Sequence, residues 1–256
     1  KNINLRWHDY YGGTGEMNKA LRDGDIDIAV ILTEGIIKDI IAGNPSKIVQ
    51  TFVQTPLVWG VHVAHNSNYK TVEDLKGTKA AISRYGSGSH LMAYINAQNN
   101  NWNLEKDLNF EVIKDLNGAV EGLTQGDADY FLWEKYTTKP LVDEGVFRRV
   151  DNCPSPWPCF VIAVREEFIK KNEEDLKTIL DIINATTSEF KDIPSIDRMI
   201  SNRYEQRIED VQEWLAITEW SQEVIDESTI MNVQKELKAL DIIPKITDYK
   251  DLIYEL

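Results

Sequence analysis

The chain has 256 residues, of which 28 are basic and 42 acidic, so its formal net charge is −14. This charge repels phosphate backbones and anionic lipids, and we expect neither nucleic acid nor a membrane surface as a main partner. Hydrophobic residues make up 42% and charged residues 27%, as in ordinary globular proteins, and no apolar run approaches the roughly 18 residues of a membrane span. The length exceeds one average domain, which predicts two lobes.

The first part of the chain alternates between strands, loops and helices. Apolar and polar residues alternate over 3–9, which predicts a strand, and Gly12-Gly13-Thr14-Gly15 then opens a helix over 16–22. Residues 26–32 form a β-branched run typical of a buried parallel strand, and Thr33-Glu34-Gly35 leads into a second helix. This order predicts a doubly wound α/β fold, in which ligands bind at the carboxyl ends of strands.

A glycine- and serine-rich loop is the most distinctive stretch of the sequence. We expect strands over 48–52 and 58–64, a capped helical turn over 71–77 and a short strand over 78–82. The loop Ser83-Arg84-Tyr85-Gly86-Ser87-Gly88-Ser89-His90 follows and leads into a helix.

The first N–H groups of a helix are unpaired, so this loop suits an anionic or carbonyl oxygen. A flexible strand-to-helix turn without a ligand explains the pattern equally well. Neither the P-loop nor the dinucleotide fingerprint is present. Ser89 and His90 are sequence neighbours, which is not the pairing of a nucleophile with its base.

An internal repeat links residues 17–30 to residues 119–132. Each copy has a helix end, a Gly-Asp-x-Asp turn and an apolar strand, and the copies lie 102 residues apart. The repeat predicts two lobes built on one plan; chance similarity is the alternative, because Gly and Asp are common at such turns. A glutamate follows each strand, in Thr33-Glu34 and in Trp133-Glu134, and we expect both pairs to lie in a cleft rather than in a core.

Residues 151–159 contain Pro154, Pro156 and Pro158, and three prolines argue against both a helix and a central strand. We therefore expect a rigid crossing between the lobes. Trp157 within this crossing either stacks on a ligand or packs locally, and the residues alone leave both interpretations open.

The sequence contains no recognisable catalytic or metal-binding motif. Cys153 and Cys159 are too few for a disulfide scaffold, and their spacing is compatible with a loop disulfide or with two free thiols. His62 and His65 lie three residues apart in or beside a strand, so their side chains are expected on opposite faces. The paired aspartates of the repeat fit turn and capping roles, and we expect no metal, no cofactor and no catalytic group.

The remaining chain completes the two lobes and then becomes helical. Strands are expected over 110–116, 130–132, 146–150 and 160–164. Trp214 and Trp220 are expected to pack between helices rather than to contact a ligand. The expected C-terminal helices cover residues 166–171, 174–191, 195–204, 208–215 and 221–239.

On these motifs the sequence resembles the type II periplasmic-binding-protein fold, in its subfamily of taurine, sulfonate and pyrimidine-precursor binders. It is similar above all to a small yeast and bacterial group of this fold whose ligand is unassigned, which shares Ser-Arg-x-Gly-Ser-Gly-Ser-His and Pro-x-Pro-Trp-Pro. The resemblance covers residues 5–170 well and the helical tail loosely. It is carried by Gly12 to Gly15, Gly24 to Ala29, Thr33 to Gly35, Val72 to Gly77, Ser83 to His90 and Gly126 to Asp129.

The resemblance implies a monomeric solute-binding protein that captures a small organic ligand between two lobes, for import by an ABC permease. Closure of the lobes on the ligand would be a hinge motion. A periplasmic or cell-envelope location is implied if the chain is exported; a cytoplasmic location is the alternative, since no export signal is visible. An enzyme on the same fold, of the thiamine-pyrimidine or menaquinone-route type, and an intracellular ligand sensor are the alternative functions.

Members of the family carry an extra strand, a ligand-contacting loop and a helix upstream of the position of Ile3. The printed sequence does not contain these elements, so contacts from that loop are not among those expected here.

We expect residues 1–72 and 155–256 to form one lobe and residues 73–154 to form the other. Backbone N–H groups and hydroxyls at Ser87 to Ser89 would hold an acidic or carbonyl group, Trp133 or Trp157 would stack on a flat ring, and the two glutamates would accept from ligand N–H groups. The expected ligand-binding residues are Gly12, Gly13, Thr14, Thr33, Glu34, Gly35, Ser83, Arg84, Ser87, Gly88, Ser89, His90, Trp133, Glu134 and Trp157.

Overall fold

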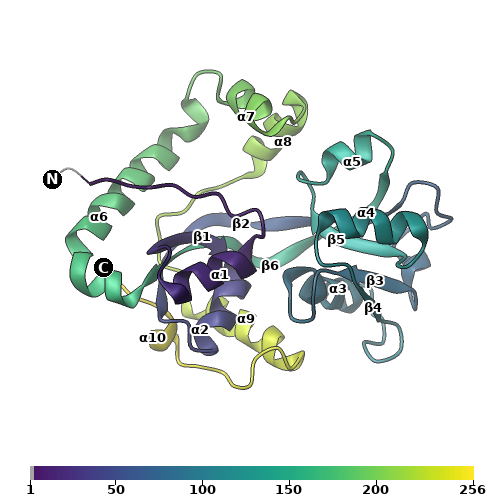
Figure 1. Ribbon diagram of the computed structural model, residues 1–256, viewed down its shortest axis with the longest axis horizontal. Coiled ribbons are helices and arrows are strands. Elements are labelled where there is room, and N and C mark those ends of the chain that lie inside the picture. Colours follow the sequence, from purple (N-terminus) through teal and green to yellow (C-terminus); the bar gives the residue numbers. More distant parts are fainter. Residues whose placement is uncertain (1–2) are drawn as a thin grey trace. The chain divides into compact units, whose positions relative to one another are not determined.

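The computed structural model describes residues 3–256, which fold into two compact units (Figure 1). Unit 1 contains residues 3–55, Trp157–Ile200 and Leu215–Leu256. Unit 2 contains Pro56–Pro156 and Ser201–Trp214. Residues 56–72 and 201–214, which the sequence analysis assigns to the first lobe, therefore cluster with the second unit. Each unit is described by itself below.

Unit 1 is built around β1 (Ile28–Leu32), with α1 (Thr14–Asp23) and α2 (Thr33–Ile41) packed against it. β1 pairs antiparallel with β6 (Phe147–Arg165), in register from Ile28 opposite Val164 to Leu32 opposite Phe160. The expectation of a parallel strand over 26–32 is wrong in this respect. An apolar run indicates that a strand is buried, but it does not distinguish a parallel neighbour from an antiparallel one.

The C-terminal part of the chain is mostly helical and belongs to unit 1 except for residues 201–214, which cover the end of α7 and most of α8. α6 (Glu166–Glu189) buries Ile169, Leu176 and Leu180 against Ile162 and Val164 of β6. Its backbone leaves the helical conformation at Asn172, with φ −137°, where the sequence analysis separates two helices. The remaining helical elements are η2 (Phe190–Asp192), α7 (Ile196–Tyr204), α8 (Ile208–Ile217), α9 (Glu227–Ala239) and α10 (Tyr249–Leu252).

The expected helix over 221–239 is wrong at its beginning. The Ser221 N–H donates to Phe52 O at 3.1 Å and the Thr51 N–H donates to Glu223 O at 2.8 Å, so this segment runs along β2 (Ser46–Ala64). α9 begins only after Asp226, whose side chain accepts from the Thr229 N–H at 2.9 Å. Hydrogen bonds from Ser228 and Thr229 lower the pKa of Asp226 to about 2. An aspartate that caps a helix marks its start.

Unit 2 contains the strand order β2-β5-β3-β4. β5 (Tyr130–Glu134) pairs antiparallel with β2 and parallel with β3 (Lys79–Ile82), and β3 pairs parallel with β4 (Asn109–Val112). α3 (Gly88–Asn99) and α4 (Leu116–Gln125) pack against β3 and β5. The short elements η1 (Glu73–Leu75) and α5 (Lys139–Asp143) complete the unit. Its core includes Ala81, Ile113, Leu123, Phe131 and Phe147.

Two long strands, β2 and β6, overturn two expectations about proline. β2 runs unbroken through Pro56, where the sequence analysis places a gap between two strands. β6 runs unbroken through Pro154, Pro156 and Pro158, which were expected to exclude a strand. The three prolines are spaced by two, so the N–H groups they lack all belong to one edge of the strand. Their side chains share the more exposed face, while Ser155 and Trp157 occupy the buried face.

Residues 3–10 form no strand within the described part of the chain. Leu5, Trp7 and Tyr11 are exposed, with 72% of Trp7 accessible, although alternation over 3–9 predicts a strand. Alternation places side chains on two faces, but a strand also needs a neighbour for its backbone hydrogen bonds.

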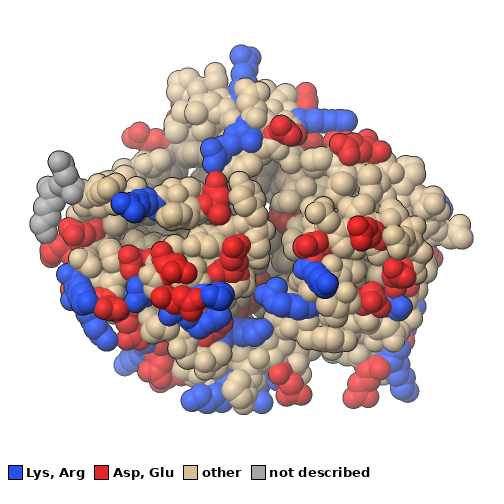
Figure 2. Space-filling model, viewed as in Figure 1, with Lys and Arg blue, Asp and Glu red and all other residues tan. Residues whose placement is uncertain are grey.

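Acidic and basic side chains are interspersed over the face shown in Figure 2, so on that face the excess of acidic residues is not gathered in one patch. No helix of residues 3–256 is long and apolar enough to cross a membrane.

Candidate functional site

A buried glutamate lies at the start of α2 in unit 1. Glu34 is 7% exposed, and the indole Nε1–H of Trp157 donates to its Oε2 at 3.0 Å. Burial raises the pKa of the Glu34 carboxyl, which favours its neutral form. Trp157 is itself 3% exposed, on the buried face of β6. Trp157 therefore packs locally and orients a carboxyl group, and its stacking on a ligand stays a prediction.

Hydrogen bonds from side chains to backbone carbonyls hold the segment around Glu34 in place. The Thr33 hydroxyl donates to Pro158 O at 2.6 Å, and this bond ties the end of β1 to β6. The Asn18 Nδ2 donates to Gly35 O at 3.1 Å, and this second bond ties α1 to α2. A Cβ on Gly35 would lie 2.2 Å from Cγ2 of Thr14, so only glycine allows the starts of these two helices to approach so closely.

The predicted Gly12-Gly13-Thr14 turn lies at the start of α1. The Gly12 N–H donates to Oε2 of Glu16 at 2.9 Å, and Gly13 has φ 67°, a conformation that favours glycine. The structure therefore brings Thr14, Glu34, Gly35 and Trp157 together in unit 1. Asn18, a buried amide that binds Gly35, is missed by the sequence analysis, because a single Asn in a helix carries no motif.

In unit 2 the serines of the predicted cradle bond to one another. Ser89 is 1% exposed, and its Oγ accepts from the Ser83 N–H at 3.0 Å. The same Oγ lies 3.3 Å from Ser83 Oγ and 3.1 Å from Ser87 Oγ. Ser87 also caps α3, because its Oγ accepts from the His90 N–H at 3.4 Å. These bonds fix the loop whether or not a ligand is present, and a ligand role for the serines stays a prediction.

His90 anchors the same loop from inside an aromatic cluster. Its Nδ1 accepts from the Gly86 N–H at 3.0 Å, so the ring proton of neutral His90 lies on Nε2. Its ring lies 4.7 Å from that of Phe110, 5.0 Å from that of Tyr94 and 5.3 Å from that of Tyr85. Arg84 at the tip of the loop is exposed. Of the predicted loop residues, Arg84 is therefore the one whose charged group is accessible.

Trp133 and Glu134 at the end of β5 both contact their own unit. Trp133 stacks on Phe131 with ring centroids 5.1 Å apart and packs, partly buried, against the core of unit 2. Phe131 and Trp133 are two residues apart in one strand and share a face. Oε1 of Glu134 accepts from the Tyr136 N–H at 3.0 Å, and Oε2 accepts from the Thr137 N–H at 2.6 Å. A ligand role for either residue stays a prediction.

The cysteines and histidines have structural positions. Cys153 and Cys159 are free and buried, and six residues of extended strand separate them by about 20 Å, too far for a disulfide. Burial raises the pKa of the Cys153 thiol to about 12. Burial lowers the pKa of the fully buried His62 to about 4, whereas His65 is exposed. Residues 3–256 contain no group of three or more His, Cys, Asp and Glu able to hold a metal ion.

Comparison with known proteins identifies the fold. Residues 59–153 match the family model of the Ca3427-like PBP. The chain is similar to the Candida albicans CA3427 gene product, which defines a family with the generic periplasmic binding protein fold; the TM-score is 0.84 at 24% identity, over 95% of this chain and 84% of that one.

Two sulfonate-binding proteins show the same architecture. The alkanesulfonate-binding protein SsuA from Xanthomonas axonopodis pv. citri, bound to MOPS, matches with TM-score 0.81 and 16% identity over 96% of this chain and 86% of that one. The aliphatic sulphonate-binding protein SsuA from Escherichia coli matches with TM-score 0.71 and 18% identity over 94% and 80%. No curated protein matches the sequence. The resemblance predicted from the sequence motifs is thereby confirmed, and the chain has the periplasmic-binding-protein fold.

Proposed function

We propose that this chain is a solute-binding protein that captures a small organic ligand for ABC-type import, without chemical turnover. The observation that supports this most is the fold, shared over 96% of the chain with an alkanesulfonate-binding protein. The proposal includes export to the periplasm or cell envelope and a permease partner. The sequence-based hypothesis of one cleft shared by two lobes stays part of the prediction.

The residues around Glu34 indicate the chemistry of the ligand. Glu34 is buried and oriented by Trp157, and its carboxyl can accept a hydrogen bond from an amine or ring N–H group. In unit 2 the exposed guanidinium of Arg84 and the start of α3 favour an anionic group. Together these groups favour an amino-sulfonate or a small heterocycle with an acidic or carbonyl substituent.

The proposal is tested by calorimetric titration of three probes: taurine, ethanesulfonate and a 4-aminopyrimidine. Glu34→Gln should weaken taurine binding about ten- to hundredfold, because a charge-assisted hydrogen bond contributes about 1.5–3 kcal/mol. Ethanesulfonate lacks the amine, so the same variant should leave its affinity unchanged. Arg84→Gln should weaken both sulfonates and spare the aminopyrimidine.

The matched control is Glu174→Gln, which removes an exposed carboxylate of α6. It should bind all three probes as the parent chain does. If none of the probes binds, or if Glu34→Gln and Glu174→Gln behave alike, Glu34 is not a ligand contact. Release of a modified product during the titration would instead indicate an enzyme on this fold.

A further inference from the structure

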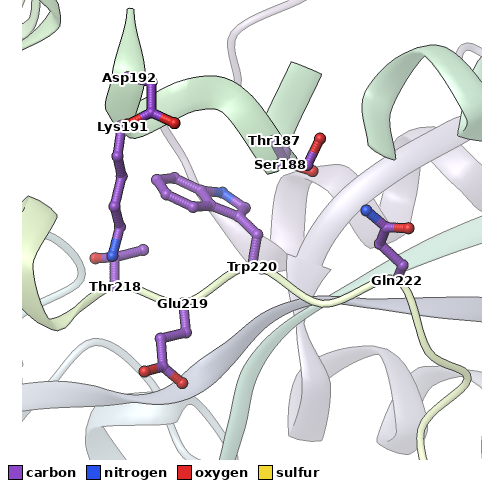
Figure 3. Close-up of a pocket in the computed structure, with 8 residues that line it drawn as sticks. All are labelled: Thr187, Ser188, Lys191, Asp192, Thr218, Glu219, Trp220 and Gln222. Carbon is purple, nitrogen blue, oxygen red and sulfur yellow. The ribbon is translucent and has the colours of Figure 1, made fainter. Parts of the chain in front are cut away.

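Unit 1 contains a cavity that is lined by none of the candidate ligand residues. It has a volume of about 450 Å³ and lies between the end of α6 with η2 and the segment that follows α8 (Figure 3). That volume is within the range of small-molecule sites, about 300–1,000 Å³. The lining residues are Thr187, Ser188, Lys191, Asp192, Thr218, Glu219, Trp220 and Gln222.

Trp220 forms a fixed floor for this cavity. Its ring packs edge to face on Phe190, with centroids 5.0 Å apart. The backbone on both sides of Trp220 is bonded to β2, because the Gln54 N–H donates to Glu219 O at 2.8 Å and the Ser221 N–H donates to Phe52 O. In Figure 3 the indole lies at the centre of the site, with Asp192 on one side and Ser188 on the other. A fixed aromatic face attracts cations through its negative quadrupole.

The two hydroxyl groups near Trp220 donate their protons to backbone carbonyls of α6. The Ser188 hydroxyl donates to Ala185 O at 2.8 Å, and the Thr187 hydroxyl donates to Asn184 O at 3.2 Å. The Gln222 Nε2 donates to the same Asn184 O at 3.3 Å. The two hydroxyl oxygens therefore keep lone pairs as acceptors, whereas the amide of Gln222 turns its nitrogen toward the indole in Figure 3 and keeps a second N–H.

The charges of the site favour a cation next to Asp192. Among residues 3–256 the Asp192 carboxylate has no ion-pair partner within 4.0 Å. In Figure 3 the Lys191 side chain lies on the Asp192 side of the indole and extends away from the carboxylate toward Thr218, and Glu219 points away from the ring. The space over the indole is thus bordered by one carboxylate and two hydroxyl acceptors.

We propose that this cavity binds a small organic cation with N–H donors, a primary ammonium or a guanidinium compound. The cation would lie over the Trp220 ring, donate to Asp192 and fill the hydroxyl acceptors of Ser188 and Thr187. A quaternary ammonium ion has the same charge but no N–H, so it would gain only the contact with the ring. This site is separate from the one proposed for the imported solute.

Agmatine, which carries a guanidinium and a primary ammonium, is a suitable probe, with tetramethylammonium as the comparison cation. The seven tryptophans can be labelled as 5-fluorotryptophan, and the ¹⁹F resonance of residue 220 assigned from its loss in Trp220→Phe. Agmatine should shift that resonance selectively and saturate it. Asp192→Asn should weaken agmatine binding at least tenfold, and tetramethylammonium should bind at least tenfold more weakly than agmatine.

The matched control is Asp181→Asn, which removes an exposed carboxylate of α6 that does not line the cavity. It should leave agmatine affinity unchanged. Equal loss in Asp181→Asn and Asp192→Asn would overturn the proposal, because it would show diffuse attraction to a chain of net charge −14. Equal binding of both cations, a shift at another tryptophan, or no agmatine binding at millimolar concentration would overturn it too.

Discussion

The two copies of the Gly-Asp-x-Asp repeat have the same backbone and different side-chain roles. Gly24 and Gly126 end their helices with φ 81° and 85° and an identical ψ of 18°. The following N–H groups repeat as well: Asp25 donates to Ala20 O at 2.9 Å, and Asp127 donates to Gly122 O at 2.8 Å. The glutamate after the first strand is buried under Trp157, whereas the glutamate after the second accepts from its own turn.

This difference shows that the repeat predicts the backbone of the turn but not the roles of the side chains that follow it. The turn is local, since its hydrogen bonds join residues five apart, and both copies close it in the same way. The side chains that follow the apolar run have different partners in the two copies. Glu34 meets Trp157 from β6, while Trp133 meets Phe131 of its own strand and Trp59 of β2.

The largest expected effect comes from removing the side chain of Trp133, which packs in the second copy of the repeat. Trp133→Ala should lower the free energy of unfolding by about 3 kcal/mol, the low end for a large aromatic side chain, because Trp133 is only partly buried. Trp133→Phe keeps a ring against Phe131 and should cost less than half as much. Urea denaturation of the unliganded protein measures both. An unchanged midpoint in Trp133→Ala would contradict this packing role and support the cleft role expected from the sequence.

A second prediction concerns His62, which is buried in unit 2. Its Nε2 lies 2.9 Å from Oγ1 of Thr138, and its Nδ1 has no partner in the described structure. Burial lowers the pKa of His62 to about 4, below the unfolded value of 6.5. The unfolded chain thus binds a proton first as the pH falls, and about 3 kcal/mol of stability should be lost between pH 6.5 and 4.

The variant that tests this is His62→Gln, with His65→Gln as the exposed control. Unfolding free energies measured at pH 7 and pH 4.5 should fall less steeply in His62→Gln than in the parent chain. His65→Gln should follow the parent. Equal slopes in all three would show that His62 does not carry the acid sensitivity.

A third prediction concerns the close approach of α1 and α2. Gly35→Ala should destabilise the chain by about 1–3 kcal/mol, because the new methyl group overlaps Cγ2 of Thr14. Thr14→Ser removes that methyl group, so the double variant should recover most of the loss. Thermal unfolding of the parent chain, the two single variants and the double variant measures the coupling free energy between Gly35 and Thr14. Additive losses would mean that Gly35 is needed for another reason.

The smallest expected effect is in the turn after β5. Glu134→Ala should cost about 1 kcal/mol, as for the loss of a helix cap, because two backbone N–H groups lose their carboxylate. Glu134→Gln keeps an acceptor and should cost less. Chemical denaturation resolves the two variants. A larger loss in Glu134→Gln than in Glu134→Ala would contradict the capping role.

The local features of this protein follow from its sequence. The helix starting after Gly13, the break at Asn172, the repeated turns at Gly24 and Gly126 and the loop ahead of α3 are all predicted, because their hydrogen bonds join near neighbours. The resemblance carried by these motifs also indicates the fold. Local backbone preferences are read directly from residue type and spacing.

The partners of each segment are decided only by the tertiary structure. The direction of β1, the continuity of β6 through three prolines and the pairing of residues 219–223 with β2 depend on neighbours far along the chain. The same holds for the bond from Trp157 to Glu34 and for the cavity over Trp220. A residue pattern specifies which face of an element is apolar, but burial and hydrogen bonding between distant elements exist only once the chain has folded.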